Sequence, residues 1–164
     1  MAFTQFYVQS TGSNLNSGST NTDSATLTYA SGNWVAGTGV FTVASGNPTS
    51  DGVAVGDFAS VYADGSTVTG FVGRVTARDT TTITVSLTAK SGTAPVDGTG
   101  TRTLKIGGAW KGCNGTEAFP LDFAAGTMTN TTGNPPHAAW KAGTYSITGA
   151  LTHSLDTGAI WHEG

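Results

Sequence analysis

Alternation between apolar and polar residues runs through the middle of the chain and predicts β-strands. It is clearest at 82–88, where Ile83, Val85 and Leu87 alternate with Thr and Ser residues. A period of two places one set of side chains on a buried face and the other set in water. Leu104 and Ile106 repeat the pattern and are expected to point inward. Comparable runs lie at 3–8, 25–29, 40–44, 53–62 and 68–75.

Turn signals separate these runs at short intervals. Asp64-Gly65 and Arg78-Asp79 each stand between two strand-like segments, and Asp-Gly pairs are typical of tight β-turns. Five or six strands at roughly ten-residue spacing predict a small antiparallel barrel or sandwich. We therefore expect an all-β protein with this module across residues 38–106.

The regions on either side of the predicted barrel have different patterns. Residues 10–24 carry one apolar side chain, Leu15, which predicts a surface loop that buries almost nothing. Together with the strand at 3–8, this loop belongs to an entry region, residues 1–37. Residues 107–136 mix aromatic residues, Gly and Pro without a period. This predicts an irregular segment that caps the open end of a core. The cap and the C-terminal end form a third region, residues 107–164.

The composition agrees with the all-β assignment. The 164 residues include 30 Thr, 14 Ser and 24 Gly, whereas helix-favouring Glu and Lys are scarce. Thr suits a half-buried pleated surface, and Gly suits the turns between strands. The apolar share of 37% is too high, and too regularly patterned, for a disordered chain.

Charge and segment composition exclude several classes of partner. The net charge is −3 and the cationic residues are scattered, so we expect no nucleic-acid partner. No apolar run is long enough to span a membrane, and the N-terminus lacks the basic leader and apolar core of a signal peptide. We therefore expect no membrane partner and synthesis in the cytoplasm. The single cysteine, Cys113, excludes an intrachain disulfide.

Candidate catalytic and metal-binding residues are few. The only histidines are His137, His153 and His162, and they lack the spacing of converging metal ligands. Asp51, Asp57 and Asp64 could supply paired carboxylates for glycoside cleavage. Each, however, adjoins a Gly at a corner, where Asp is favoured for local turn hydrogen bonds. We therefore expect turn roles for these residues, no metal, no cofactor and no enzymatic activity.

Four tryptophans stand in Gly-rich, mostly irregular stretches: Trp34, Trp110, Trp140 and Trp161. An exposed Trp can stack on a sugar ring, whereas a buried Trp stabilises a core or a protein interface. We favour core or interface positions over a sugar platform. Trp161, near the C-terminal end, is the strongest candidate for contact with a partner.

Two parts of the chain resemble known folds. Residues 55–86, VGDFASVYADGSTVTGFVGRVTARDTTTITVS, resemble the small SH3-like barrels of many binding and virion modules. KAGTYSIT at 141–148, followed by Leu151 and Ile160, looks like the first coil of a right-handed parallel β-helix. Proteins of that kind include pectate-lyase-like enzymes and phage tailspikes. The N-terminal FYVQSTGSNLNSGS at 6–19 resembles the entry segment of the same family.

The β-helix resemblance implies a partner, because a parallel coil buries its apolar residues only when other coils stack on it. It implies an incipient β-helix-like C-terminal segment in a non-enzymatic virion structural protein of a bacteriophage. Such a protein would be a capsid decoration (cement) protein or a tail-spike base module, packed as a homotrimer within a larger virion assembly. The expected interface residues are Trp110, Trp140, Tyr145, Ile160 and Trp161.

An alternative from another functional class remains open. The chain could be the N-terminal module of a glycan-binding or polysaccharide-degrading β-helix protein, with a surface glycan as its ligand. We favour the virion hypothesis, and binding of the isolated chain to surface glycans would favour this alternative.

Overall fold

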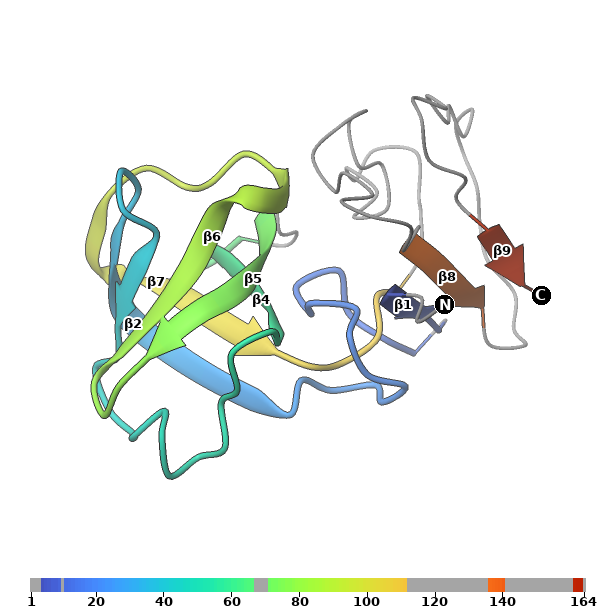
Figure 1. Ribbon diagram of the computed structural model, residues 1–164, viewed down its shortest axis with the longest axis horizontal. Helices are drawn as coiled ribbons and strands as arrows, with labels where there is room; N and C mark the ends of the chain where they lie inside the picture. Colours follow the sequence, from blue (N-terminus) through green and yellow to red (C-terminus); the bar gives the residue numbers. More distant parts are fainter. Residues whose placement is uncertain (1–3, 10, 67–70, 112–135, 141–160, 164) are drawn as a thin grey trace.

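The computed structural model describes residues 4–9, 11–66, 71–111, 136–140 and 161–163, and within these ranges the chain is β-strand and loop. No helix that could cross a membrane occurs in this described part. The all-β prediction is confirmed. The strands (Figure 1) are β1 Thr4–Val8, β2 Leu27–Val35, β3 Val40–Thr42, β4 Phe58–Ala63, β5 Phe71–Arg78, β6 Thr82–Gly92, β7 Gly98–Ile106, β8 Pro136–Trp140 and β9 Trp161–Glu163.

Six of the strands close into an antiparallel barrel in the order β2-β3-β6-β5-β4-β7, with β7 pairing back onto β2. The predicted antiparallel barrel is therefore confirmed as a closed one. Closure gives each barrel strand a neighbouring strand on both sides. The barrel forms the left half of the view in Figure 1.

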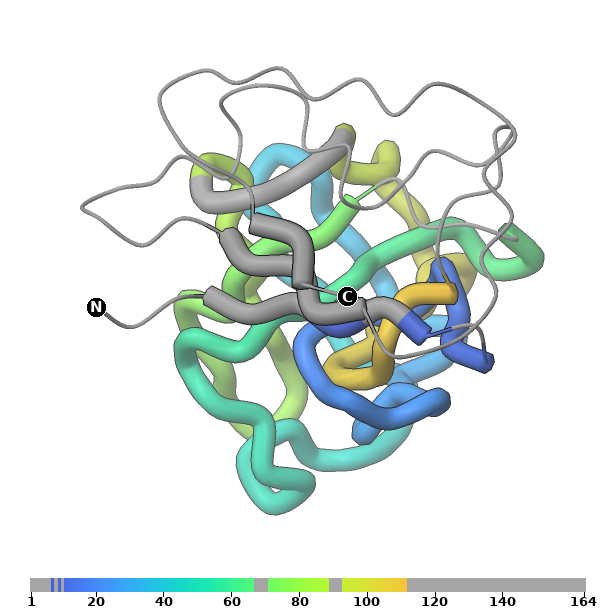
Figure 2. The backbone as a smooth tube through the Cα atoms, turned by 90° about the vertical axis from the view of Figure 1, so that its right-hand side faces the viewer, coloured from blue at the N-terminus to red at the C-terminus, as the bar shows by residue number. Residues whose placement is uncertain are grey.

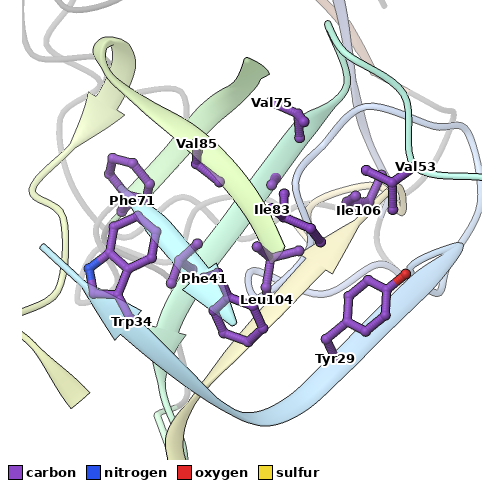
Figure 3. Close-up of a cluster of buried hydrophobic side chains, with 12 residues drawn as sticks. Tyr29, Trp34, Phe41, Val53, Phe71, Val75, Ile83, Val85, Leu104 and Ile106 are labelled. Atoms are coloured by element: carbon purple, nitrogen blue, oxygen red, sulfur yellow. The ribbon is translucent and has the colours of Figure 1, made fainter. Parts of the chain in front are cut away.

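The barrel interior is filled by the apolar side chains that the alternation singled out. Ile83 and Val85 of β6 and Leu104 of β7 are fully buried, and Leu87 packs against them at the edge of the core. Figure 3 shows Ile83, Val85 and Leu104 converging with aromatic rings from other strands. The core cluster also includes Tyr29, Trp34, Phe41, Val53, Val61, Phe71, Val75 and Ile106.

Strand β2 belongs to the barrel, so the barrel spans Leu27–Ile106 rather than 38–106. The sequence hides this because Ser31-Gly32-Asn33, in the middle of β2, has the composition of a turn. In the structure the segment is a β-bulge, with shifts in the β2–β7 register on both sides of Gly32. Ser31 adopts a positive φ of 54°, and the strand bends without ending.

The N-terminal loop, residues 11–24, also differs from its prediction, because it is partly buried. Asn14, Asn16, Ser17 and Gly18 are buried beside the segment that follows β7. Figure 2 shows this blue loop lying against the gold segment. Polar side chains tolerate burial when their hydrogen bonds are made. Asn16 Nδ2 donates to the Ala109 carbonyl at 2.9 Å, and Ser17 Oγ accepts from the Gly107 amide at 2.9 Å.

The remaining strands form a second, parallel sheet in the order β1-β8-β9. β1 pairs with β8 from Thr4↔Pro136 to Val8↔Trp140, and β8 pairs with β9 from His137↔Trp161 to Ala139↔Glu163. On its other side, β1 exchanges backbone hydrogen bonds with Gly18 and Trp110. The predicted coil at 141–148 and the 112–135 part of the predicted cap lie outside the described residues.

Candidate functional site

A pocket of about 490 Å³ lies at one end of the barrel, where β2 and β4 begin and β7 ends. Its walls come from segments far apart in the sequence, and the pocket lies within the size range of small-molecule sites. The lining combines hydroxyls, two carboxylates, one guanidinium and an apolar floor. The residues are Ser19, Thr20, Thr26, Leu27, Asp51, Gly52, Gly56, Asp57, Phe58, Arg74 and Ile106.

The loop at 47–57 supplies both carboxylates of the pocket. Asp51 Oδ2 accepts hydrogen bonds from the Asn47 amide at 3.0 Å and from the Tyr29 hydroxyl at 2.9 Å. Asp57 Oδ2 accepts from the Ala54 amide at 2.8 Å. The turn roles predicted for these two residues are confirmed. The second oxygen of each carboxylate accepts no hydrogen bond from the described residues.

Tyr29 holds the Asp51 side chain from inside the barrel. Burial, and then the hydrogen bond to the Asp51 carboxylate, raise the pKa of the Tyr29 phenol well above its ordinary value of 10.0. At neutral pH the phenol is therefore protonated and donates to Asp51. This contact stabilises one wall of the pocket.

Arg74 of β5 supplies the only cation in the described lining of the pocket. Its guanidinium carbon lies 4.3 Å from the centroid of the Phe58 ring, within the range of a cation–π contact. Arg74 Nη1 also donates to the Gly56 carbonyl at 3.3 Å. Phe58 and Arg74 face each other in the β4–β5 register, so the backbone pairing itself brings the ring and the guanidinium together.

The N-terminal loop and Thr26, which directly precedes β2, supply the hydroxyl-bearing wall. Thr20 Oγ1 accepts from the Gly108 amide at 2.6 Å, and the Thr26 amide donates to the Ile106 carbonyl at 2.8 Å. The Ser19 hydroxyl lies 2.8 Å from that of Ser17. The pocket is therefore completed only because the loop packs against the end of β7.

Asp64, the third carboxylate that the sequence suggested, lies outside this pocket. It accepts from the Thr103 hydroxyl at 2.7 Å and from the Ser31 hydroxyl at 3.1 Å. It thus joins the turn after β4 to β7 and to the β2 bulge. The structure therefore brings two of the three candidate carboxylates into one pocket and gives the third a separate bracing position.

The predicted interface residues have different outcomes. Trp110 is fully buried inside its own chain, where Nε1 donates to the Asn16 carbonyl at 2.7 Å. Its ring therefore holds the N-terminal loop rather than offering surface to a partner. Trp140 and Trp161 lie in strands β8 and β9. Tyr145 and Ile160 lie outside the described residues, and the interface role of these four residues stays a prediction.

Trp34, which the sequence left between core and interface, belongs to the barrel core. It is 1% exposed, and its Nε1 donates to the Pro95 carbonyl at 2.9 Å. Its ring lies 5.8 Å from that of Phe71, centroid to centroid. The structure thus uses Trp34 to close the end of the barrel near the β6–β7 connection.

The described residues contain no group of three or more His, Cys, Asp or Glu side chains placed to hold a metal. His137 and His162 lie on the neighbouring strands β8 and β9, one register step apart. His153 and Cys113 lie outside the described residues.

Sequence reasoning missed the hydroxyl wall and Arg74. Ser19, Thr20 and Thr26 are three among many Ser and Thr residues, and nothing local distinguishes them. Arg74 could have been noted as a lone cation on an otherwise apolar strand candidate. Its position opposite Phe58 could not have been predicted, because it depends on the β4–β5 register.

The architecture defines the class of the molecule: an all-β protein built on a closed six-stranded antiparallel barrel with an adjoining three-stranded parallel sheet. Comparison of the chain with protein-family models, with curated proteins and with solved structures finds no significant match.

Proposed function

We propose that the chain is a non-enzymatic structural protein of a bacteriophage virion, either a capsid decoration protein or a tail-spike base module. In this proposal it acts by packing against copies of itself, as a trimer, and against a larger assembly. The observation that carries the proposal is the parallel sheet β1-β8-β9, which brings together strands from both ends of the chain.

Parallel sheets are normally covered on both faces, and exposed strand edges are sites for pairing with other chains. β1 is flanked by β8 on one side and by residues 18 and 110 on the other. Within the described part of the chain, β9 has one strand neighbour, β8. A neighbouring copy adding to this side would extend the sheet in the manner expected for stacked coils.

The closed barrel suits a module that must remain separate while the sheet assembles. Because each of its strands has a strand partner on both sides, it offers little backbone edge for uncontrolled association. The large apolar side chains that the described part of the barrel exposes are Val35, Val55 and Val96. Assembly is therefore expected through the parallel sheet.

The decisive experiment is the native mass of the purified chain, measured by light scattering at micromolar concentration. A trimer or another closed oligomer supports the virion-subunit proposal. A monomer that stays monomeric over the whole concentration range contradicts self-assembly. It would instead favour the alternative, a module of a longer glycan-binding or polysaccharide-degrading β-helix protein.

A substitution tests whether the β9 region carries the assembly. We expect Trp161→Ala to weaken self-association about tenfold or more, because a Trp removed from an interface commonly costs over ~1.4 kcal/mol. Val96→Ala is the matched control, since Val96 is an exposed apolar residue of the barrel. Sedimentation equilibrium measures the association constant, and circular dichroism checks that the barrel stays folded. Unchanged association in Trp161→Ala would remove Trp161 from the interface.

A further inference from the structure

We propose that the pocket at the barrel end is a binding site for a neutral, polyhydroxylated ligand, specifically a pyranose sugar ring. The inference goes beyond the structural role proposed above, because it concerns the barrel and would hold for a monomer or an oligomer. It rests on the chemistry of the lining, which combines two carboxylates, one guanidinium and three hydroxyl side chains over an apolar floor.

The charges of the pocket disfavour an anion more than a cation. Asp51 and Asp57 repel an anion from the 47–57 wall, while Arg74 in the same lining repels a cation. An anion therefore meets two like charges, whereas a cation meets one like charge beside two carboxylates that attract it. A neutral ligand with many hydroxyls meets acceptors and donors without that penalty.

The polar groups match the hydrogen-bonding of adjacent sugar hydroxyls. Each carboxylate keeps one oxygen that accepts no hydrogen bond from the described residues, so each can accept from a ligand hydroxyl. The hydroxyls of Ser19 and Thr26 can both donate and accept. Hydrogen bonds that involve a charged partner are the stronger ones, so the carboxylates should dominate the affinity.

The floor of the pocket suits the apolar face of a sugar ring. Leu27, Phe58 and Ile106 are the apolar residues of the lining, and the Arg74 guanidinium lies over the Phe58 ring. The C–H groups of a pyranose can pack on such a surface while its hydroxyls point to the rim.

The polar groups are held in place before any ligand arrives. Asn47 and Tyr29 orient Asp51, Ala54 orients Asp57, and the Val75 amide donates to the Asp57 carbonyl at 2.8 Å. Thr20 is held by the Gly108 amide. Such preorganisation reduces the entropy lost on binding.

The test is an NMR titration of the full chain with methyl glycosides of glucose, galactose, mannose and N-acetylglucosamine at millimolar concentrations. We expect at least one glycoside to shift amide signals of residues 19–27 and 51–58 in a saturable way. Glucuronate and N-acetyl-lysine methylamide are the anionic and cationic probes, and both should bind more weakly. If the free sugar binds but its methyl glycoside does not, the site takes a free sugar rather than a ring within a glycan chain.

Two variants localise the binding. Asp57→Asn retains an acceptor for the Ala54 amide but loses the charge, and we expect affinity to fall about tenfold or more. Thr26→Trp should block the pocket, whereas Thr28→Trp, on an exposed residue outside the lining, should leave binding unchanged. Amide spectra confirm that each variant is folded. The proposal is overturned if no neutral sugar binds, if either charged probe binds more tightly, or if Thr26→Trp binds as well as the wild type.

Discussion

At the residue scale, the stability of the barrel depends on which face of each strand a side chain occupies. Val85 is fully buried, whereas Thr88 on the same strand is exposed. A shift of one position along a strand moves a side chain from the core to water. Substitutions on the two faces of β6 should therefore differ greatly in their effect.

We expect Val85→Asp to destabilise the fold by ~3 kcal/mol or more, because an unpaired carboxylate would be buried among apolar side chains. Thr88→Asp, its control, should change the free energy of unfolding by less than ~0.5 kcal/mol. Urea unfolding followed by circular dichroism measures both. Equal effects of the two substitutions would contradict the register of β6.

The carboxylate of Asp79 gives a prediction about pH. Hydrogen bonds from the Thr81 amide, and then from the hydroxyl and amide of Thr82, lower its pKa from 3.8 to about 2. Because the folded-state pKa lies below the unfolded value, ionised Asp79 stabilises the fold above pH 3.8, and this contribution is lost as pH falls towards 2.

Asp79→Asn should therefore be less stable than the wild type near neutral pH, with a difference that narrows as pH falls from about 4 to 2. Urea midpoints at several pH values measure this difference. Thr80→Ser, on an exposed residue of the same turn, controls for general acid effects. A difference that stays constant over this pH range would mean that the Asp79 hydrogen bonds do not favour the ionised form.

At the element scale, the β2–β3 turn contains two glycines, of which one is required by the backbone conformation and the other is not. Gly39 has a φ of +70°, and a Cβ there would collide with the Val85 carbonyl oxygen. A Cβ on Gly37 would meet nothing within 4 Å. The same turn therefore contains a matched pair of positions.

We expect Gly39→Ala to destabilise the barrel by more than ~1 kcal/mol, because the left-handed backbone and the close approach to β6 both exclude a side chain. Gly37→Ala should be neutral or stabilising by up to ~1 kcal/mol. Thermal unfolding of the two variants decides the point. Similar melting temperatures for both would contradict the described turn.

The sequence predicted where strands occur, but it did not predict which strands join the barrel. The alternation at 82–88 and the turn signals at Asp64-Gly65 and Arg78-Asp79 correctly predicted strands and corners. The place of β2 in the barrel was missed, because Ser31-Gly32-Asn33 has the composition of a turn. A bulge and a turn use the same residue types, and only pairing with β7 distinguishes them.

At the scale of the whole molecule, the N-terminal loop joins the barrel to the parallel sheet. Trp110 lies where the two meet: its ring packs on Gly18, its side chain bonds to Asn16, and its amide donates to Tyr7 of β1. Loss of this contact should weaken both the loop and the seating of β1.

We expect Trp110→Phe to cost ~1–2 kcal/mol, because it leaves the buried Asn16 carbonyl without its donor. Trp110→Ala should cost ~3–5 kcal/mol through the added cavity. Lys111→Ala, on an exposed side chain, is the control and should change stability by less than ~0.5 kcal/mol. Urea unfolding measures the costs. Hydrogen exchange at Ser17 and Gly107 reports the loop, and unchanged protection in Trp110→Ala would contradict its role there.

The candidate pocket could not have been found from the sequence. Asp51 and Asp57 were noted as carboxylates, but their shared pocket depends on the fold of the 47–57 loop against β5. Two residues of the hydroxyl wall, Ser19 and Thr20, lie in a loop that the sequence placed on the surface. Its burial depends on Asn16 and Ser17 finding backbone partners about ninety residues away, and no local pattern reports such contacts.

The sequence by itself determined the all-β class, the inward set of residues on β6 and β7, and the corners between strands. These follow from the two-residue period of a strand and from local turn hydrogen bonds, which act over a few residues. Only the tertiary structure decided barrel closure, the bulged course of β2, the parallel pairing of β1 with β8, and the pocket. Each of these requires hydrogen bonds or packing between distant segments, whose partners are chosen by the folded chain as a whole.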